Sequence, residues 1–140
     1  MWQRRNKFNS CRSKGLDGYN YASKLEAAVA NKFYNNKENI ILDRQIKFNF
    51  FADSNNILFT SPFSKVKGSE KLLGYIPDFF VEDTNTKEQY YVEAKGDTNT
   101  QDWKRKVKYW ILCCDKKLLV YSGSYKNPKV TSTIIPKNYK

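Results

Sequence analysis

Histidine is absent from this chain of 140 residues, and its absence excludes several kinds of chemistry. A Ser-His-Asp triad, a Cys-His protease and any nuclease that uses histidine as a general base or metal ligand are ruled out. The three cysteines, Cys11, Cys113 and Cys114, form no C-x-x-C pair, which argues against a structural zinc site or a disulfide framework. Hydrolytic chemistry must therefore come from carboxylates, lysine, tyrosine, cysteine or a bound metal.

Long apolar runs are also missing. No run approaches the length that spans a membrane, and the polar, basic N-terminus lacks the apolar segment of a secretory signal. Free thiols suit a reducing compartment. We therefore expect a cytoplasmic protein with no membrane partner. The abundance of Asn, Lys and Tyr suits AT-rich coding such as that of a phage, in which case the compartment is the bacterial host cytoplasm.

Acidic residues are few: 14 Asp and Glu stand against 25 Lys and Arg, a formal net charge of +11. This excess favours a polyanionic partner, with nucleic acid the first candidate. The alternative is a basic surface that only maintains solubility. Composition predicts a basic, flexible arm over residues 1–20 and a single domain over residues 21–140. In the arm, the residues predicted to contact DNA are Arg4, Arg5, Lys7, Arg12 and Lys14, although an arm without a role is the alternative.

Apolar periodicity predicts a mixed α/β fold. One helix is expected from Ser23 to Asn36 and a second from Gln101 to Cys113. Residues 61–74 are expected to form a loop, and Asp83–Thr86 to form the turn of a hairpin. Strands are expected at residues 40–51, 57–60, 75–82, 88–95, 118–121 and 130–135, the last of them at an edge.

The candidate active site combines Asp78, which follows Pro77, with Glu93 and Lys95. Residues 93 and 95 are two apart on one predicted strand, so their side chains share a face. Asp78 lies on the partner strand of the hairpin, and two adjacent carboxylates favour a cation between them. Mg²⁺ prefers such oxygen ligands, and a neighbouring lysine can orient a water and offset charge on a phosphate. An exposed Glu-Lys pair on a strand is the alternative.

A third carboxylate, Glu26, has two possible roles. It could reach the same metal from the first helix. However, Ser23 and Glu26 also have the S-x-x-E spacing of a capping box, in which the glutamate only binds a backbone N–H. The local sequence leaves both roles open.

Two further groups of lysines are candidates for DNA contact. One group lies in the predicted loop and the other on one face of the second helix, where like charges at i, i+4 repel each other without an anion. A solvated surface is the alternative for both. The residues are Lys65, Lys67, Lys104 and Lys108.

Together, Pro77-Asp78, Glu93-x-Lys95 and the helical Glu26 resemble the motifs of the PD-(D/E)XK nuclease superfamily, which has the restriction-endonuclease-like fold. Within that superfamily the chain is more similar to the phage endonuclease I group of Holliday-junction resolvases. The similar segments are 21–26, 44–48, 76–79 and 92–96, and the resemblance covers about residues 21–121. The intervals 51–75 and 78–93 look longer than those of the family.

The resemblance implies a restriction-endonuclease-like core, with a mixed central β-sheet flanked by helices. It implies that Asp78, Glu93 and the Ala94 carbonyl bind Mg²⁺, for which Mn²⁺ substitutes, that Glu26 completes the cluster and that Lys95 assists catalysis. It also implies a homodimer that resolves four-way junctions, with 40–51 as the segment that could be exchanged between subunits. Two alternatives remain: a nuclease of this fold acting on ends, single strands or a specific site, and a basic nucleic-acid-binding module without catalysis.

Overall fold

The computed structural model describes residues 12–140. Arg4, Arg5, Lys7 and Cys11, which figure in the sequence-based predictions, lie outside the described residues. The elements are β1 (Ser13–Lys14), β2 (Asn20–Tyr21), α1 (Lys24–Asn35), β3 (Asn39–Arg44), β4 (Phe48–Ala52), β5 (Leu58–Ser61), β6 (Glu70–Tyr75), β7 (Phe79–Asp83), β8 (Gln89–Ala94), α2 (Gln101–Cys113), β9 (Leu118–Ser122) and β10 (Lys129–Ile134).

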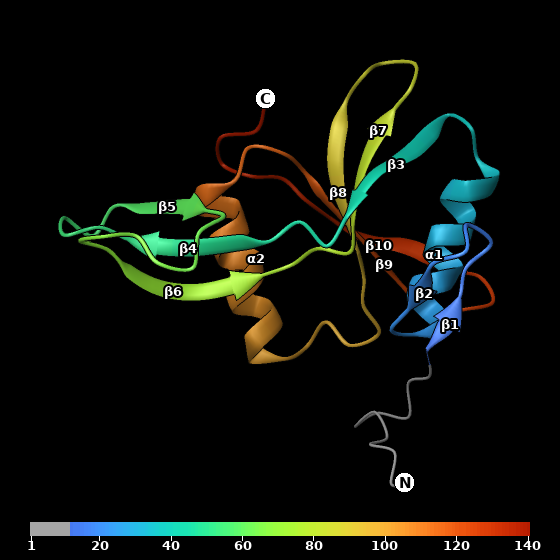
Figure 1. Ribbon diagram of the computed structural model, residues 1–140, viewed down its shortest axis with the longest axis horizontal. Coiled ribbons are helices and arrows are strands. Elements are labelled where there is room, and N and C mark those ends of the chain that lie inside the picture. Colours follow the sequence, from blue (N-terminus) through green and yellow to red (C-terminus); the bar gives the residue numbers. More distant parts are fainter. Residues whose placement is uncertain (1–11) are drawn as a thin grey trace, which may run out of the picture.

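The central element is a five-stranded mixed sheet with the order β10-β9-β8-β7-β3, in which only β8 and β9 run parallel. Helices α1 and α2 pack on its two sides (Figure 1). The prediction of a mixed α/β protein with a mixed central sheet is therefore confirmed. Strand β10 lies at the edge of this sheet, as expected. The β7–β8 hairpin and the bounds of α2 also match the prediction.

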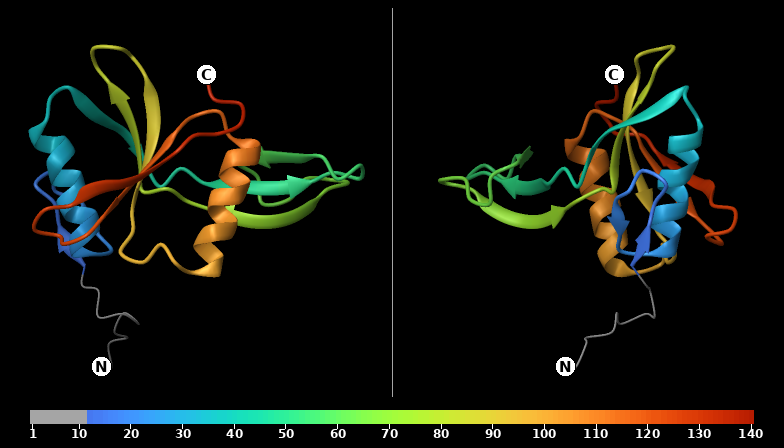
Figure 2. Two further views of the ribbon diagram at one scale, coloured as in Figure 1. Left: turned by 180° about the vertical axis from the view of Figure 1, so that it is seen from behind. Right: turned by 45° about the vertical axis from the view of Figure 1, so that its right-hand side comes forward.

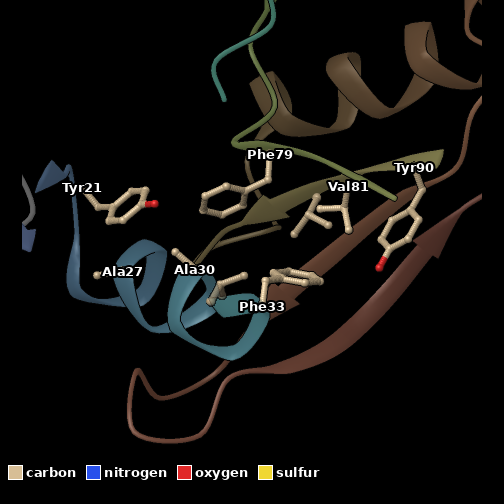
Figure 3. Close-up of a cluster of buried hydrophobic side chains, with 9 residues drawn as sticks. Tyr21, Ala27, Ala30, Phe33, Phe79, Val81 and Tyr90 are labelled. Carbon is tan, nitrogen blue, oxygen red and sulfur yellow. The ribbon is translucent and has the colours of Figure 1, made fainter. Parts of the chain in front are cut away.

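Helix α1 begins where the sequence predicts because its first turn is capped. The Ser23 side chain accepts a hydrogen bond from the Glu26 N–H at 3.1 Å, satisfying one of the unpaired donors of the helix terminus. The apolar face of the helix buries Val29, Ala30 and Phe33 against the central sheet. Figure 3 shows Ala30 and Phe33 on the side of α1 that faces Phe79 and Val81 of β7. Burial of this apolar face holds α1 in place.

Helix α2 fixes the other side of the sheet through tryptophan. Trp110 is completely buried and its indole N–H donates to the Lys116 carbonyl at 2.9 Å. Its ring packs edge-on against Phe48, Tyr75 and Tyr91. Each contact joins α2 to a different strand, so the helix holds the central sheet and the neighbouring three-stranded sheet together.

The prediction of one continuous strand over residues 40–51 is wrong. These residues form two strands, β3 in the five-stranded sheet and β4 in a separate three-stranded sheet of order β5-β4-β6. The chain bends at Gln45, whose φ of 60° lies in the left-handed region that a strand does not use. Asn49 of β4 is fully buried although it is polar, and its amide donates to the Phe63 carbonyl at 2.9 Å.

Two other boundaries differ for related reasons. The predicted loop 61–74 contains most of β6, and the predicted strand 75–82 is interrupted at residues 76–78 before β7 starts. Pro77 cannot donate to a strand ladder, and the interruption at this position lets β6 and β7 belong to different sheets. The three-stranded sheet consequently extends away from the five-stranded sheet (Figure 2).

The last part of the predicted flexible arm is folded. Strands β1 and β2 pair as a short antiparallel ribbon, with Ser13 opposite Tyr21. The Tyr21 ring then packs edge-on against Phe79, which anchors the ribbon to the core. Arg12 and Lys14 are exposed on it. Within residues 12–140, neither helix has the length and apolar character needed to cross a bilayer.

Candidate active site

The β7–β8 hairpin brings Asp78 and Glu93 together. Phe79 pairs with Val92, and continuing this register by one residue puts Asp78 opposite Glu93. The Ala94 N–H donates to Asp78 Oδ2 at 2.8 Å and thereby fixes that carboxylate at the end of β8. Asp78 is buried, with 8% of its surface exposed, although it stands before β7 rather than on a strand as predicted.

Lys95 follows directly after β8. Its backbone N–H donates to the Tyr121 carbonyl at 2.9 Å, which extends the parallel pairing with β9 by one residue. Its ammonium group stands 5.4 Å from the centre of the Trp103 ring, at a distance where a cation is attracted to an aromatic face. Glu93 and Lys95 line the same pocket, in agreement with their predicted placement on one face.

Glu26 performs the capping role and also faces the site. Its Oε2 accepts a hydrogen bond from the Ala22 N–H at 3.0 Å, which secures the chain just before α1. The same carboxyl lies close enough to Asp78 to raise the pKa of that residue, and the two residues line one pocket. The structure thus brings Glu26, Asp78 and Glu93 into one region.

Burial and mutual repulsion dominate the electrostatics of these acids. Burial raises the pKa of Asp78 well above its usual range, and the nearby Glu93 and Glu26 carboxyls raise it further. Burial also raises the pKa of Glu93 to about 7, although the Tyr75 hydroxyl and Lys95 oppose that rise by favouring the charged form. Two acids that resist ionisation next to each other are suited to a cation, which removes the repulsion.

The donor chemistry fits a hard divalent cation. Across residues 12–140, no three acidic or cysteine side chains converge into a ready-made metal cage. Mg²⁺ does not require one, because it is usually held by one or two carboxylates together with waters and substrate phosphates. Asp78 and Glu93 each receive a hydrogen bond on one oxygen, Oδ2 and Oε1 respectively, so their second oxygens are the atoms available to a cation.

The acids separate two pockets. A pocket of about 540 Å³ is lined by Glu26 and Asp78 together with Arg12, Tyr19 and Arg44. A second pocket, of about 400 Å³, is lined by Glu93 and Lys95 and by residues of β6 and α2. The metal-binding candidates therefore line two different pockets.

Tyr75 is a site residue that the sequence pattern missed. It is the last residue of β6, its side chain is almost fully buried, and its hydroxyl donates to Glu93 Oε1 at 2.6 Å. Burial and the Glu93 charge raise its pKa well above the usual value, so the hydroxyl keeps its proton and remains a donor. No local signal marks Tyr75, since it reaches Glu93 only through the packing of two sheets.

The structure does not bring the other predicted DNA-binding lysines to the acids. Lys65 and Lys67 are exposed in the connection between β5 and β6, and Lys104 and Lys108 are exposed on α2. None of the four lines either of the two pockets beside the acids. Comparisons with protein families, with curated proteins and with solved structures found no match to this chain.

Proposed function

We propose that the protein is a Mg²⁺-dependent DNA endonuclease with a restriction-endonuclease-like core of the PD-(D/E)XK type. The observation that carries the proposal is the buried Asp78 opposite Glu93, with Lys95 one residue past the end of the same strand. The net charge of +11 supports a polyanionic substrate. The chain would act in the cytoplasm, where its thiols stay reduced.

Each side chain has a defined task in this proposal. A bound Mg²⁺, or Mn²⁺ in its place, would neutralise charge on the phosphate under attack and make a water more acidic. Asp78 and Glu93, with the Ala94 carbonyl, would hold the cation, while the Tyr75 hydroxyl keeps Glu93 oriented. Glu26 would add a further carboxylate. Lys95 would offset the negative charge that grows on the phosphate oxygens and orient the attacking water.

The proposed substrate is branched DNA, in particular the four-way junction of recombination or replication in a phage. The resemblance to the endonuclease I group supports this choice. Two strands of a four-way junction must be cut together, which calls for a homodimer with two active sites. The break of 40–51 into β3 and β4 leaves the short link at residues 45–47 as the point where a strand exchange between subunits would begin.

Cleavage of a synthetic four-way junction tests the proposal. With Mg²⁺, the wild-type protein should cut the junction faster than a linear duplex of the same sequence, and EDTA should stop the reaction. Lys95→Ala and Asp78→Asn should each lower the cleavage rate by at least about a hundredfold. Lys95→Ala should still bind the junction in EDTA. The substitution removes the group that orients the attacking water, but it leaves the DNA-binding surface in place.

Glu38→Gln supplies the matched control, since it removes an exposed carboxylate in the α1–β3 connection. It should cut at the wild-type rate. Cleavage by Lys95→Ala at that rate would contradict the assignment of the site. Equal rates on junction and linear duplex would redirect the proposal to ends, single strands or a specific site. Salt-sensitive binding without any metal-dependent cutting would identify a non-catalytic binding module.

A further inference from the structure

Four lysines line the pocket that Glu93 also lines. Lys47 comes from the link between β3 and β4, Lys71 from β6, Lys95 from the end of β8 and Lys106 from α2. We call this 400 Å³ cavity the basic pocket. Its lysines come from four separate parts of the chain, so a run of basic sequence cannot account for their meeting.

Two of these ammonium groups are held against aromatic rings at the wall of the pocket. Lys95 Nζ lies 5.4 Å from the centre of the Trp103 ring, and Lys106 Nζ lies 5.7 Å from that of Tyr75. Both rings are almost completely buried. Contacts of this kind restrict the movement of a long side chain. The lysine therefore loses less conformational entropy when a ligand binds.

The charge of the basic pocket is unbalanced. Glu93 is the single acid among its lining residues, against the four lysines. Asp102 pairs with Lys106 at 2.9 Å but is itself largely exposed, so water screens much of that ion pair. Like charges gathered in one cavity repel each other, and an anion that enters it would relieve the repulsion.

A buried acceptor without a partner lies next to Gly74, which lines the pocket. Asn49 is fully buried, yet among the described residues its Oδ1 has no hydrogen-bond donor. A Cβ added at Gly74 would lie 3.2 Å from that oxygen and 3.7 Å from Lys71 Nζ. Glycine at position 74 therefore leaves open the space between the amide oxygen and the lysine. A buried acceptor of this kind suits a water or an ammonium group as its hydrogen-bond donor.

The pocket on the other side of the acids has a different character. Arg44, one of the two arginines that line it, forms an ion pair of 2.9 Å with Asp17 and donates a hydrogen bond of 3.0 Å to the Tyr21 hydroxyl. Asp43, Asp78 and Glu26 also line this cavity. Its positive charge is therefore largely matched within the protein, unlike that of the basic pocket.

We propose that the basic pocket binds phosphate groups of the nucleic-acid strand that is cut, so that the strand reaches Glu93 and Lys95 over β6 and α2. This inference rests on the proposed nuclease function and adds the side from which the substrate enters. It assigns DNA contact to Lys47, Lys71 and Lys106, which differ from the lysines that the sequence pattern indicates.

Binding of a fluorescent single-stranded oligonucleotide in EDTA tests the inference without any cleavage. The variant Lys71→Gln/Lys106→Gln should raise Kd by at least about tenfold. The charge-matched control Lys126→Gln/Lys129→Gln, on the β9–β10 hairpin outside both pockets, should stay within about twofold of wild type. Equal losses in the two double variants would overturn the inference, because they would report net charge alone.

Two additions keep the result decisive. Because Lys106 pairs with Asp102, thermal unfolding of each variant is measured. If the double variant fails to fold, Lys71→Gln alone is compared with Lys126→Gln.

Oligonucleotides with a 5′-hydroxyl or a 5′-phosphate show which phosphate the pocket binds. If it binds internal phosphodiesters, the two oligonucleotides should bind equally; if it binds a terminal phosphate, the 5′-phosphorylated oligonucleotide should bind more tightly. Since binding is read in EDTA, failure of the nuclease proposal would appear separately, as wild-type protein that binds DNA and does not cut it with Mg²⁺.

Discussion

At the scale of single residues, Glu93 has opposing neighbours. Burial and Glu26 favour its protonated form, whereas the Tyr75 hydroxyl and Lys95 favour its carboxylate. The balance raises its pKa to about 7, so its charge changes within the range in which enzymes are ordinarily assayed. Without a cation, this residue couples the stability of the fold to pH.

Metal-free protein should lose stability as pH rises from about 5 to about 8. Between its ordinary pKa of 4.5 and its folded-state pKa of about 7, Glu93 keeps its proton in the folded chain and releases it in the unfolded chain, so the folded state binds more protons and each step up in pH favours unfolding. Glu93→Gln should have a flatter profile, with a difference on the order of 3 kcal/mol over the range. Urea unfolding in EDTA at a series of pH values measures this slope.

Glu38→Gln should keep the wild-type slope in that experiment, since it removes a carboxylate outside the site. Added Mg²⁺ should restore stability at the alkaline end for wild type more than for Glu93→Gln, because a ligand that binds the folded state stabilises it. Identical slopes for wild type and Glu93→Gln would show that Glu93 ionises normally in the fold.

The part of the candidate site that the sequence could predict is the part that is local. Asp78, Glu93 and Lys95 lie on one hairpin, so strand alternation and turn residues suffice to bring them together. Tyr75 and Lys106 could not be found this way. They reach Glu93 because α2 and β6 pack beside β8, and tertiary packing of this kind leaves no trace in local spacing.

At the scale of elements, the first turn of α1 serves the helix and the site together. Ser23 caps the helix through the Glu26 N–H, while the Glu26 carboxyl binds the Ala22 N–H and faces Asp78. The Glu26 carboxyl therefore satisfies a backbone N–H and also lies near Asp78, while metal binding by this residue stays a prediction.

Paired substitutions should separate the two roles. Ser23→Ala should lower the free energy of unfolding by about 1 kcal/mol, through loss of the cap, and leave the affinity for Mg²⁺ unchanged. Glu26→Gln keeps an oxygen for the Ala22 N–H but removes a charge beside Asp78, so stability should be preserved and Mg²⁺ affinity should fall. Urea unfolding and calorimetric titration with Mg²⁺ give the two readouts.

The reverse pattern, with Ser23→Ala altering Mg²⁺ affinity and Glu26→Gln altering only stability, would assign Glu26 to the helix alone.

Element boundaries were predictable where caps mark them and unpredictable where strands change sheets. Thr100 accepts from the Trp103 N–H at the start of α2, and that helix matches the prediction at both ends. By contrast, polar and apolar residues alternate from Gln45 to Phe50, although the chain bends at Gln45 from one sheet to another. Glutamine carries no turn signal, so no residue type in the local sequence marks the change of sheet.

At the scale of the whole molecule, charge and shape act together. The five-stranded sheet with its helices forms the body, and the β4–β5–β6 sheet extends from it (Figures 1 and 2). Lys65 and Lys67 lie in the β5–β6 connection of the extending sheet, while the basic pocket lies where that sheet joins the body. Positive charge is thus available both at the junction of the two parts and beyond it.

Salt should weaken DNA binding steeply, and the N-terminal residues should account for part of the effect. Residues 1–11 carry Arg4, Arg5 and Lys7 and no acid. Deleting them should make the slope of log K against log salt shallower by about 2 for single-stranded DNA, if each cation contributes about 0.7. Fluorescence anisotropy over a range of KCl concentrations measures both slopes. An unchanged slope would show that these cations do not contact phosphate.

The two links that join the extending sheet to the body meet at the candidate site. The Gln45 N–H of one link donates to the Asp78 carbonyl of the other at 3.4 Å, and Tyr75, the last residue of β6, holds Glu93 through its hydroxyl. The three-stranded sheet is therefore connected to the acids by two short links and one tyrosine side chain. A displacement of this sheet relative to the body would change the position of the Tyr75 hydroxyl, and with it the hydrogen bond that orients the Glu93 carboxylate.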